Sequence, residues 1–178
     1  YESVKSIARS LRKQKAEVEA VVNAAGVASM NLAVTTTPTT TQKVLQTNLS
    51  GTIYCRQLFA PLMIRRKRGC FVNFSTIAVP LGLKGESVYV ASKAGVEGFS
   101  RSFAREMADF NVRVNCVAPG PVNTDLLRGI SSEQINAIVE QQVLRRQFER
   151  SDVCDVVDLL ISDKASSLSG QVLSVGGV

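Results

Sequence analysis

The apolar positions of this chain fall into short runs that alternate with longer stretches of helical periodicity. Runs that are apolar on both faces predict buried strands, at residues 20–23, 70–74, 112–117 and 171–175. Apolar residues spaced three and four apart predict helices, at residues 2–12, 40–66, 87–107, 132–141 and 151–161. Strands alternating with helices are typical of βαβ units, so the pattern predicts an α/β fold with a parallel sheet covered by helices.

Composition narrows the chemistry that this fold can perform. The 178 residues suit one domain, which we expect to span residues 1–178. The chain has no histidine, which excludes Ser-His-Asp and Cys-His nucleophiles and histidine-based metal sites, and we expect no metal. No uncharged apolar run approaches the ~18–20 residues that cross a bilayer, so we expect a soluble protein with no membrane partner.

The four cysteines, at positions 55, 70, 116 and 154, show no paired spacing, and those at 70 and 116 lie in apolar runs. A thiol in such a run acts as a small apolar side chain. We therefore expect reduced, structural cysteines and a cytoplasmic protein, or one of an organelle matrix.

The positive charge is local. Lysines and arginines outnumber acidic residues by 21 to 15, and Arg65, Arg66, Lys67 and Arg68 supply four of the six net charges. Cations at the end of a predicted helix suit its macrodipole, and that is the simplest interpretation. A docking site for an acidic partner such as a carrier protein, or a nucleic-acid patch, are the alternatives; we expect no nucleic-acid partner.

The most informative residues for chemistry are Tyr89 and Lys93, four apart on a predicted helix and so on one face of it. A phenol has a pKa near ~10 and is a weak acid at neutral pH, and a nearby ammonium is expected to lower that pKa. Such a pair can exchange a proton with a carbonyl or alcohol oxygen. Taken alone, the spacing is more often a solvated helix face.

The context of this pair changes that interpretation. Residues 89–95, Tyr-Val-Ala-Ser-Lys-Ala-Gly, resemble the Y-x-x-S-K-A signature of the short-chain dehydrogenase/reductase family. Four further segments match family motifs in the family's order, at residues 23–26 (Asn-Ala-Ala-Gly), 48–51 (Asn-Leu-Ser-Gly), 73–76 (Asn-Phe-Ser-Thr) and 115–120 (Asn-Cys-Val-Ala-Pro-Gly). The tail, residues 170–177, is similar to the closing strand of the family but lacks the usual Asp before its paired glycines. The stretch around Tyr89 and on to Glu106 looks most like the β-ketoacyl-carrier-protein reductases.

The resemblance implies roles for five residues. Tyr89 would donate the proton in carbonyl reduction, and Lys93 would lower the tyrosine pKa and bind the nicotinamide ribose. Asn48 would hold a proton-relay water through its main chain. A catalytic hydroxyl is expected thirteen residues before the tyrosine, which is Thr76, whereas a one-residue shift of the loop would present Ser75 instead. We favour Thr76.

The resemblance also implies a nicotinamide cofactor, NADP or NAD, with NADP favoured. Its expected contacts, besides Tyr89 and Lys93, are Asn23, Ala24, Gly26, Pro119, Gly120, Val122 and Thr124. Residues 123–130 resemble the substrate lid. The Gly-rich turn that binds the pyrophosphate in this family occurs nowhere in the chain. We therefore expect a Rossmann-type, doubly wound parallel sheet that lacks the family's N-terminal strands, and weak cofactor binding by this chain alone.

The expected function is NAD(P)H-dependent reduction of a carbonyl to an alcohol. The substrate would be a 3-oxoacyl thioester on acyl carrier protein, as in fatty acid biosynthesis. The alternatives are reduction of sugars, steroids or polyols, or a non-catalytic homologue used for binding or oligomerisation. The resemblance further implies a homo-tetramer or homo-dimer assembled through the helices at residues 40–66 and 87–107.

Overall fold

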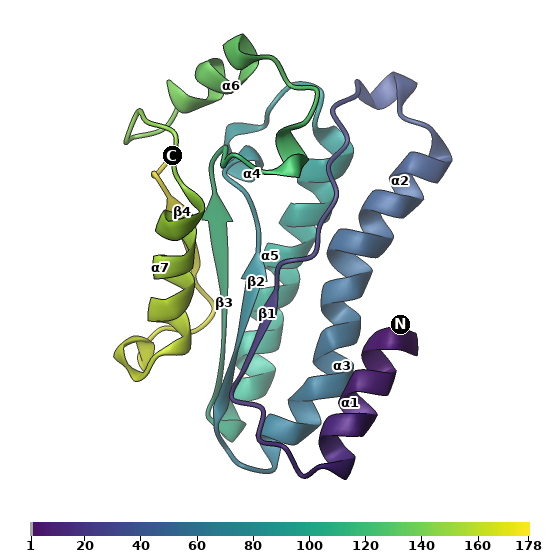
Figure 1. The fold of residues 1–178 in the computed structure, drawn as a ribbon, viewed down its shortest axis with the longest axis vertical. Helices are drawn as coiled ribbons and strands as arrows, with labels where there is room; N and C mark the ends of the chain where they lie inside the picture. The colour runs from purple at the N-terminus through teal and green to yellow at the C-terminus, as the bar shows by residue number, and fades with distance from the viewer. Residues whose placement is uncertain (1) are drawn as a thin grey trace.

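The computed structural model describes residues 2–178, and its centre is one sheet of four parallel strands (Figure 1). The strands lie in the sheet in chain order: β1 (Ala20–Asn23), β2 (Gly69–Phe74), β3 (Val112–Pro119) and β4 (Val172–Val175). All three pairings are parallel, and their register sets Asn23 beside Asn73 and Asn73 beside Cys116. Because the strands are parallel, their carboxyl ends meet at one edge of the sheet.

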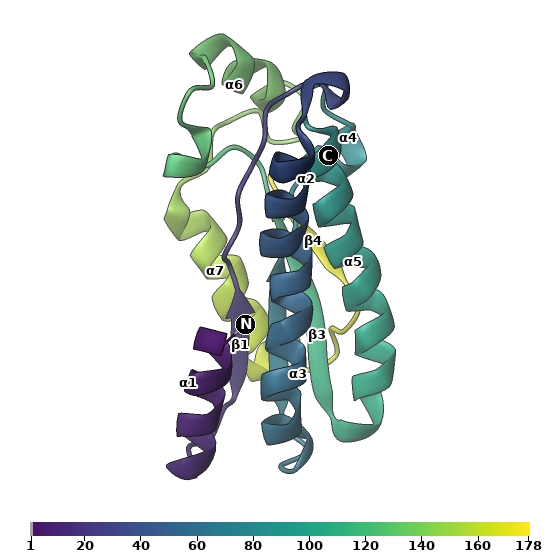
Figure 2. The same ribbon diagram turned by 90° about the vertical axis from the view of Figure 1, so that its right-hand side faces the viewer.

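Helices cover both faces of this sheet, as a doubly wound fold requires (Figure 2). One face carries α1 (Glu2–Lys13), α3 (Gly51–Ile64) and α5 (Ser87–Met107), which share an apolar core with β2 and β3 built around Phe71 and Phe103. The other face carries α7 (Arg150–Ile161), whose Val153 and Leu160 pack with Val72 and Val117. The remaining helices are α2 (Pro38–Leu45), the single turn α4 (Ala78–Leu81) and α6 (Ser132–Val139).

These elements confirm the predicted fold class and its strands, which differ from the predicted bounds by two residues at most. The long helix predicted at residues 40–66 differs in its interior. It begins at Pro38, where the Thr37 side chain accepts a hydrogen bond from the Thr40 amide, and it changes to one π-helical turn, Gln46–Ser50, before α3. The spacing of the apolar residues in the sequence gives no sign of this π turn, and the positions buried along it are Val44, Asn48 and Thr52. Such turns are frequent at functional sites.

The basic cluster Arg65–Arg68 lies in the turn between α3 and β2, at the amino end of the strand. Arg66 forms an ion pair with Glu17 (2.8 Å), and Arg68 with Asp163 (3.6 Å). The cluster is therefore at the opposite edge of the sheet from the carboxyl ends of the strands. All four cysteines are free thiols, as expected, and no helix within residues 2–178 is long and apolar enough to cross a membrane.

Candidate active site

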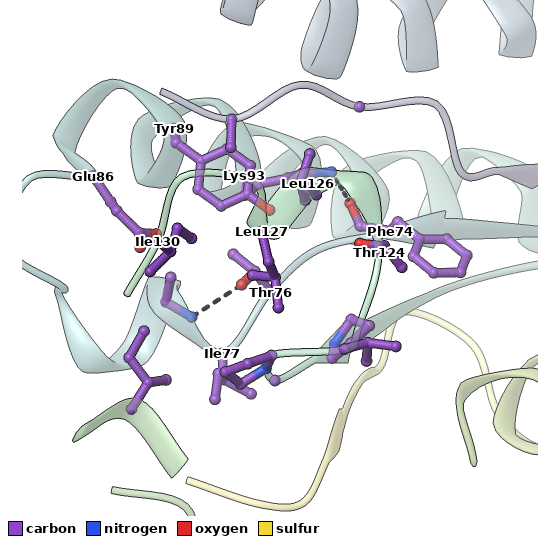
Figure 3. A pocket seen from close by; sticks show the side chains of 18 of the residues that line it. Phe74, Thr76, Ile77, Glu86, Tyr89, Lys93, Thr124, Leu126, Leu127 and Ile130 are labelled. Atoms are coloured by element: carbon purple, nitrogen blue, oxygen red, sulfur yellow. Dashed lines mark hydrogen bonds between the residues drawn. The ribbon is translucent and has the colours of Figure 1, made fainter. Parts of the chain in front are cut away.

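A cleft of about 990 Å³ opens at the carboxyl edge of the sheet. Its floor comes from the residues that follow β2 and β3, one wall from the first turns of α5, and another from the segment that contains the short helix Asp125–Leu127 (Figure 3). In parallel α/β sheets, ligands bind outside the carboxyl ends of the strands. The topology thus marks this cleft as the candidate active site.

Tyr89 and Lys93 project into the cleft from the first two turns of α5, and both are nearly buried, at 6% and 4% exposure. The Lys93 Nζ donates a hydrogen bond to the carbonyl oxygen of Phe74 (2.8 Å) and lies 5.9 Å from the centre of the Tyr89 ring. Figure 3 shows both side chains over the end of β2. The helix spacing therefore brings an ammonium and a phenol together at the strand end.

The direction of the Tyr89 pKa differs from the sequence-based expectation. The pKa of Tyr89 is raised to about 12: burial contributes most, the charge of Glu86 adds to it, and a hydrogen bond with Thr76 acts in the opposite direction. Burial also lowers the pKa of Lys93 to about 8, and the nearby Cys116 opposes this shift only in part. The expected lowering of the tyrosine pKa is therefore not seen in this structure, where burial and Glu86 determine the direction of the shift.

The two candidate hydroxyls after β2 face different surroundings. The Ser75 Oγ donates a hydrogen bond of 2.6 Å to the carboxylate of Glu97, on the second turn of α5 beyond Tyr89, and Glu97 also pairs with Arg101. Thr76 instead holds its Oγ on the cleft side, next to the Tyr89 hydroxyl, where it accepts a hydrogen bond from the Ala78 amide (3.2 Å). Both residues border the cleft, but only the Thr76 hydroxyl has a contact with Tyr89.

Asn48 is buried, at 1% exposure, inside the π-helical turn, and its side chain lies behind the cleft wall. Its amide nitrogen donates to the Val27 carbonyl oxygen and to the Ser92 Oγ, and its amide oxygen accepts from the Val27 amide, all at 2.9 Å. The Asn48 carbonyl oxygen accepts a hydrogen bond from Thr52 (2.8 Å). Asn48 thus ties the loop after β1 to α5.

Most of the predicted cofactor contacts line the cleft, namely Ala24, Gly26, Tyr89, Lys93, Pro119, Gly120, Val122 and Thr124. Asn23 does not: its side chain donates to Asn73 (2.7 Å), which in turn donates to Ser100 (2.8 Å). That chain of hydrogen bonds joins β1, β2 and α5 beneath the cleft. Asn23 therefore links two strands through its side chain, as a polar residue at the end of a strand can do.

Sequence reasoning missed two kinds of cleft residue. One is Glu86, a buried carboxyl one helical turn before Tyr89, which the i, i+3 spacing could have revealed. The other is a group of apolar residues outside the predicted lid, which join Leu126, Leu127 and Ile130 of the lid in the cleft and comprise Met30, Ile77, Leu83, Ile135 and Ile138. No local motif connects these apolar positions, so only the fold brings them to one cleft.

A nicotinamide cofactor fits the chemistry of this cleft. An ammonium group has three donors, and within residues 2–178 one hydrogen bond is formed by the Lys93 Nζ, to Phe74. A Cβ added to Gly26 would lie 3.5 Å from this Nζ, so the glycine keeps the space beside the ammonium open. Lys93 and Tyr89 would hold the ribose hydroxyls, and Pro119, Gly120, Val122 and Thr124 would border the nicotinamide ring.

Comparison with known proteins places the chain in a family. A family model described as enoyl-(acyl carrier protein) reductase matches residues 1–177. The fold, the cleft and this match define the class: the chain belongs to the short-chain dehydrogenase/reductase family and is an NAD(P)-dependent oxidoreductase.

Particular relatives refine this assignment. The chain is 35% identical over 176 residues to the 3-oxoacyl-[acyl-carrier-protein] reductase FabG of Staphylococcus epidermidis, covering 99% of this chain and 72% of that protein. It is 32% identical over 175 residues to the FabG of Salmonella typhimurium, covering 98% of this chain and 72% of that protein. The chain therefore spans a little under three quarters of the length of these relatives.

Solved structures give the same fold. The crystal structure of gox2181 superposes with a TM-score of 0.89 at 31% identity, covering 98% of this chain and 70% of that one. A 4-hydroxyisoleucine dehydrogenase mutant complexed with NADH and succinate gives a TM-score of 0.89 at 25% identity, covering 99% of this chain and 74% of that one.

Proposed function

We propose that the protein reduces the 3-oxo group of an acyl thioester to an alcohol, with NADPH as the favoured hydride donor. The observation that carries this proposal is the convergence of Tyr89, Lys93 and Thr76 on one cleft whose outer walls are apolar. The three polar groups suit a carbonyl oxygen, and the apolar residues around Leu126 and Ile130 suit an acyl chain. The names of the FabG relatives support the same substrate class and a carrier protein as the partner.

In this mechanism the substrate carbonyl oxygen lies between the Tyr89 and Thr76 hydroxyls. The Thr76 hydroxyl donates a hydrogen bond that polarises the carbonyl, and Tyr89 transfers its proton to the oxygen as negative charge develops there. The nicotinamide, when bound, supplies the hydride to the carbonyl carbon. Lys93 stabilises the phenolate that Tyr89 becomes, while its hydrogen bond to Phe74 fixes the position of the ammonium.

Asn48 has a positioning role in this proposal. Its side chain forms three hydrogen bonds, which hold Val27 and Ser92. Val27 lies in the loop after β1, and Ser92 lies between Tyr89 and Lys93 on α5. A proton-relay water on the Asn48 main chain remains part of the proposal. A homo-tetramer or homo-dimer and a cytoplasmic location are also part of the proposal.

The test is an NAD(P)H-consumption assay on the full-length protein with a panel of carbonyl substrates. We expect turnover of a 3-oxoacyl thioester, faster on acyl carrier protein than on a small thiol, and faster with NADPH than with NADH. Preferential turnover of a keto sugar, a ketosteroid or a polyol-derived ketone would overturn the substrate class. Binding of NADPH without turnover of any carbonyl would favour a non-catalytic homologue.

Paired variants of Ser75 and Thr76 distinguish the two candidate hydroxyls. Thr76→Val should lower kcat on the order of 10²-fold, because a donor to the developing oxyanion is lost, whereas Thr76→Ser should retain most activity. Ser75→Ala should leave kcat within a few-fold but reduce the free energy of unfolding by about 1–3 kcal/mol, since the buried Glu97 carboxylate loses a partner. Steady-state kinetics and urea unfolding measure both effects. The reverse pattern, with Ser75→Ala inactive and Thr76→Val active, would assign catalysis to Ser75.

A further inference from the structure

Glu86 is a buried carboxyl beside the proposed proton donor. It immediately precedes α5 as the N-cap residue, and the Val90 amide donates a hydrogen bond of 2.7 Å to its carbonyl oxygen, which fixes Glu86 at the start of the helix. Its charge acts on Tyr89, three residues further along the chain. Glu86 therefore stands next to Tyr89 on the helix, both line the cleft, and Glu86 is only 5% exposed (Figure 3).

No charged group of the cleft neutralises this carboxyl. The cations that line the cleft are Lys43, Lys93, Arg128 and Arg150. Lys93 donates to Phe74, Arg128 pairs with Asp125 (3.0 Å), and Arg150 donates to the Asn123 carbonyl oxygen. Across residues 2–178, neither a hydrogen bond nor an ion pair joins a side chain to the Glu86 carboxyl. The other ionisable groups that line the cleft are Tyr89, Asp125 and Cys154.

Burial without a partner has a direct electrostatic consequence. Desolvation raises the pKa of Glu86, which favours the neutral acid, and the charged form in turn raises the pKa of Tyr89. Two neighbouring like charges that are mostly buried repel each other more strongly than they would in bulk water. The carboxylate and the phenolate therefore oppose each other's formation.

We propose that Glu86 is a positioning residue for proton transfer, whose charge state decides how readily Tyr89 gives up or takes a proton. With Glu86 neutral, Tyr89 can become the phenolate that carbonyl reduction leaves behind. With Glu86 charged, Tyr89 is held as the phenol. The effect on turnover rests on the proposed function, but the coupling between the two groups does not.

The coupling is tested without turnover by following tyrosinate formation in the ultraviolet as the pH rises, with circular dichroism recorded at each pH. The chain has three tyrosines, so the difference between the parent protein and Tyr89→Phe isolates the titration of Tyr89. Glu86→Gln should move that titration to lower pH, whereas Glu86→Asp should leave it near the parent curve. Asp109→Asn removes a negative charge at the far end of α5 and is the matched control, expected to change nothing.

Kinetics supply the second readout. In the direction of alcohol oxidation, Tyr89 must act as a base, so at a fixed alkaline pH Glu86→Gln should raise kcat/KM roughly three- to tenfold, as expected for the loss of one neighbouring like charge in a partly aqueous site. Glu86→Asp should restore the parent pH profile. Superimposed pH profiles and Tyr89 titrations for the parent and Glu86→Gln would overturn the inference while leaving the proposed function intact. A shifted titration in a protein that reduces no carbonyl would overturn only the proposed function.

Discussion

Replacing Tyr89 by Phe should abolish NAD(P)H oxidation with a 3-oxoacyl thioester and leave the fold intact. The substitution removes the proton donor, and general acid catalysis of this kind is worth roughly 10²–10⁴-fold. The fold should survive because the buried ring stays in place and only the hydroxyl is lost. Stopped-flow or steady-state absorbance of the reduced nicotinamide measures the loss.

Two controls separate this effect from damage to the site. Nucleotide binding, measured by calorimetry on the full-length protein, should weaken by no more than the loss of the one hydrogen bond that the Tyr89 hydroxyl would give the ribose, since Lys93 and Gly26 remain beside each other. The thermal midpoint should stay within a few degrees of the parent value, because surface and shape are conserved. Parent-like turnover in Tyr89→Phe would refute the role assigned to Tyr89, whatever the substrate.

The sequence predicted the frame of this site well because its elements are locally determined. Short runs that are apolar on both faces identified the four strands β1 to β4. The spacing of Tyr89 and Lys93 placed both side chains on one face of α5. A parallel sheet then brings the ends of β1, β2 and β3 to one edge. The polar end of the cleft follows from these facts, whereas its apolar walls do not.

What the sequence could not predict depends on which way a side chain turns. Ser75 and Thr76 are adjacent hydroxyls, and only the position of Glu97 behind the strand explains why one is bound there and the other meets Tyr89. The direction of the Tyr89 pKa was also out of reach. It depends on burial and on Glu86, and a motif that includes only the lysine neglects both.

The basic cluster illustrates the same limit for partners. For Arg65–Arg68 the sequence favoured a helix-end role and left an acidic partner as an alternative, because a sequence does not reveal which surface a charged cluster occupies. The structure ties Arg66 and Arg68 to acidic residues at the amino edge of the sheet, away from the cleft of the same chain. These ion pairs give Arg66 and Arg68 partners within the chain itself.

Replacing Lys93 by Met should remove activity and, at neutral pH, stabilise the protein. The loss of activity follows because the phenolate of Tyr89 loses its counter-charge, and we expect kcat/KM to fall on the order of 10²-fold or more. The gain in stability follows from linkage. The pKa of Lys93 is lowered from the ordinary value of 10.5 to about 8, so burial of its charge opposes folding at every pH below about 8.

The gain in the free energy of unfolding has an expected size and an expected pH dependence. A pKa difference of this size corresponds to about 3 kcal/mol of opposition to folding, of which the lost hydrogen bond to Phe74 should cancel about 1–2 kcal/mol. Between about pH 8 and 10.5 the unfolded state binds more protons than the folded one, so the parent protein gains stability as the pH rises. The advantage of Lys93→Met should therefore be present at pH 7 and be lost, or reversed, near pH 10.5.

Urea unfolding of the parent and Lys93→Met proteins at neutral and alkaline pH measures this difference in stability. Lys164→Met serves as the control, because Lys164 is exposed on the short helix after α7. The control should show no comparable change with pH. A Lys93→Met protein less stable than the parent at pH 7 would mean that the ammonium is stabilised by the folded site. Lys93 would then stabilise the folded state. The expected result means instead that burial of the Lys93 charge destabilises the folded state, and that the residue serves the proposed reaction.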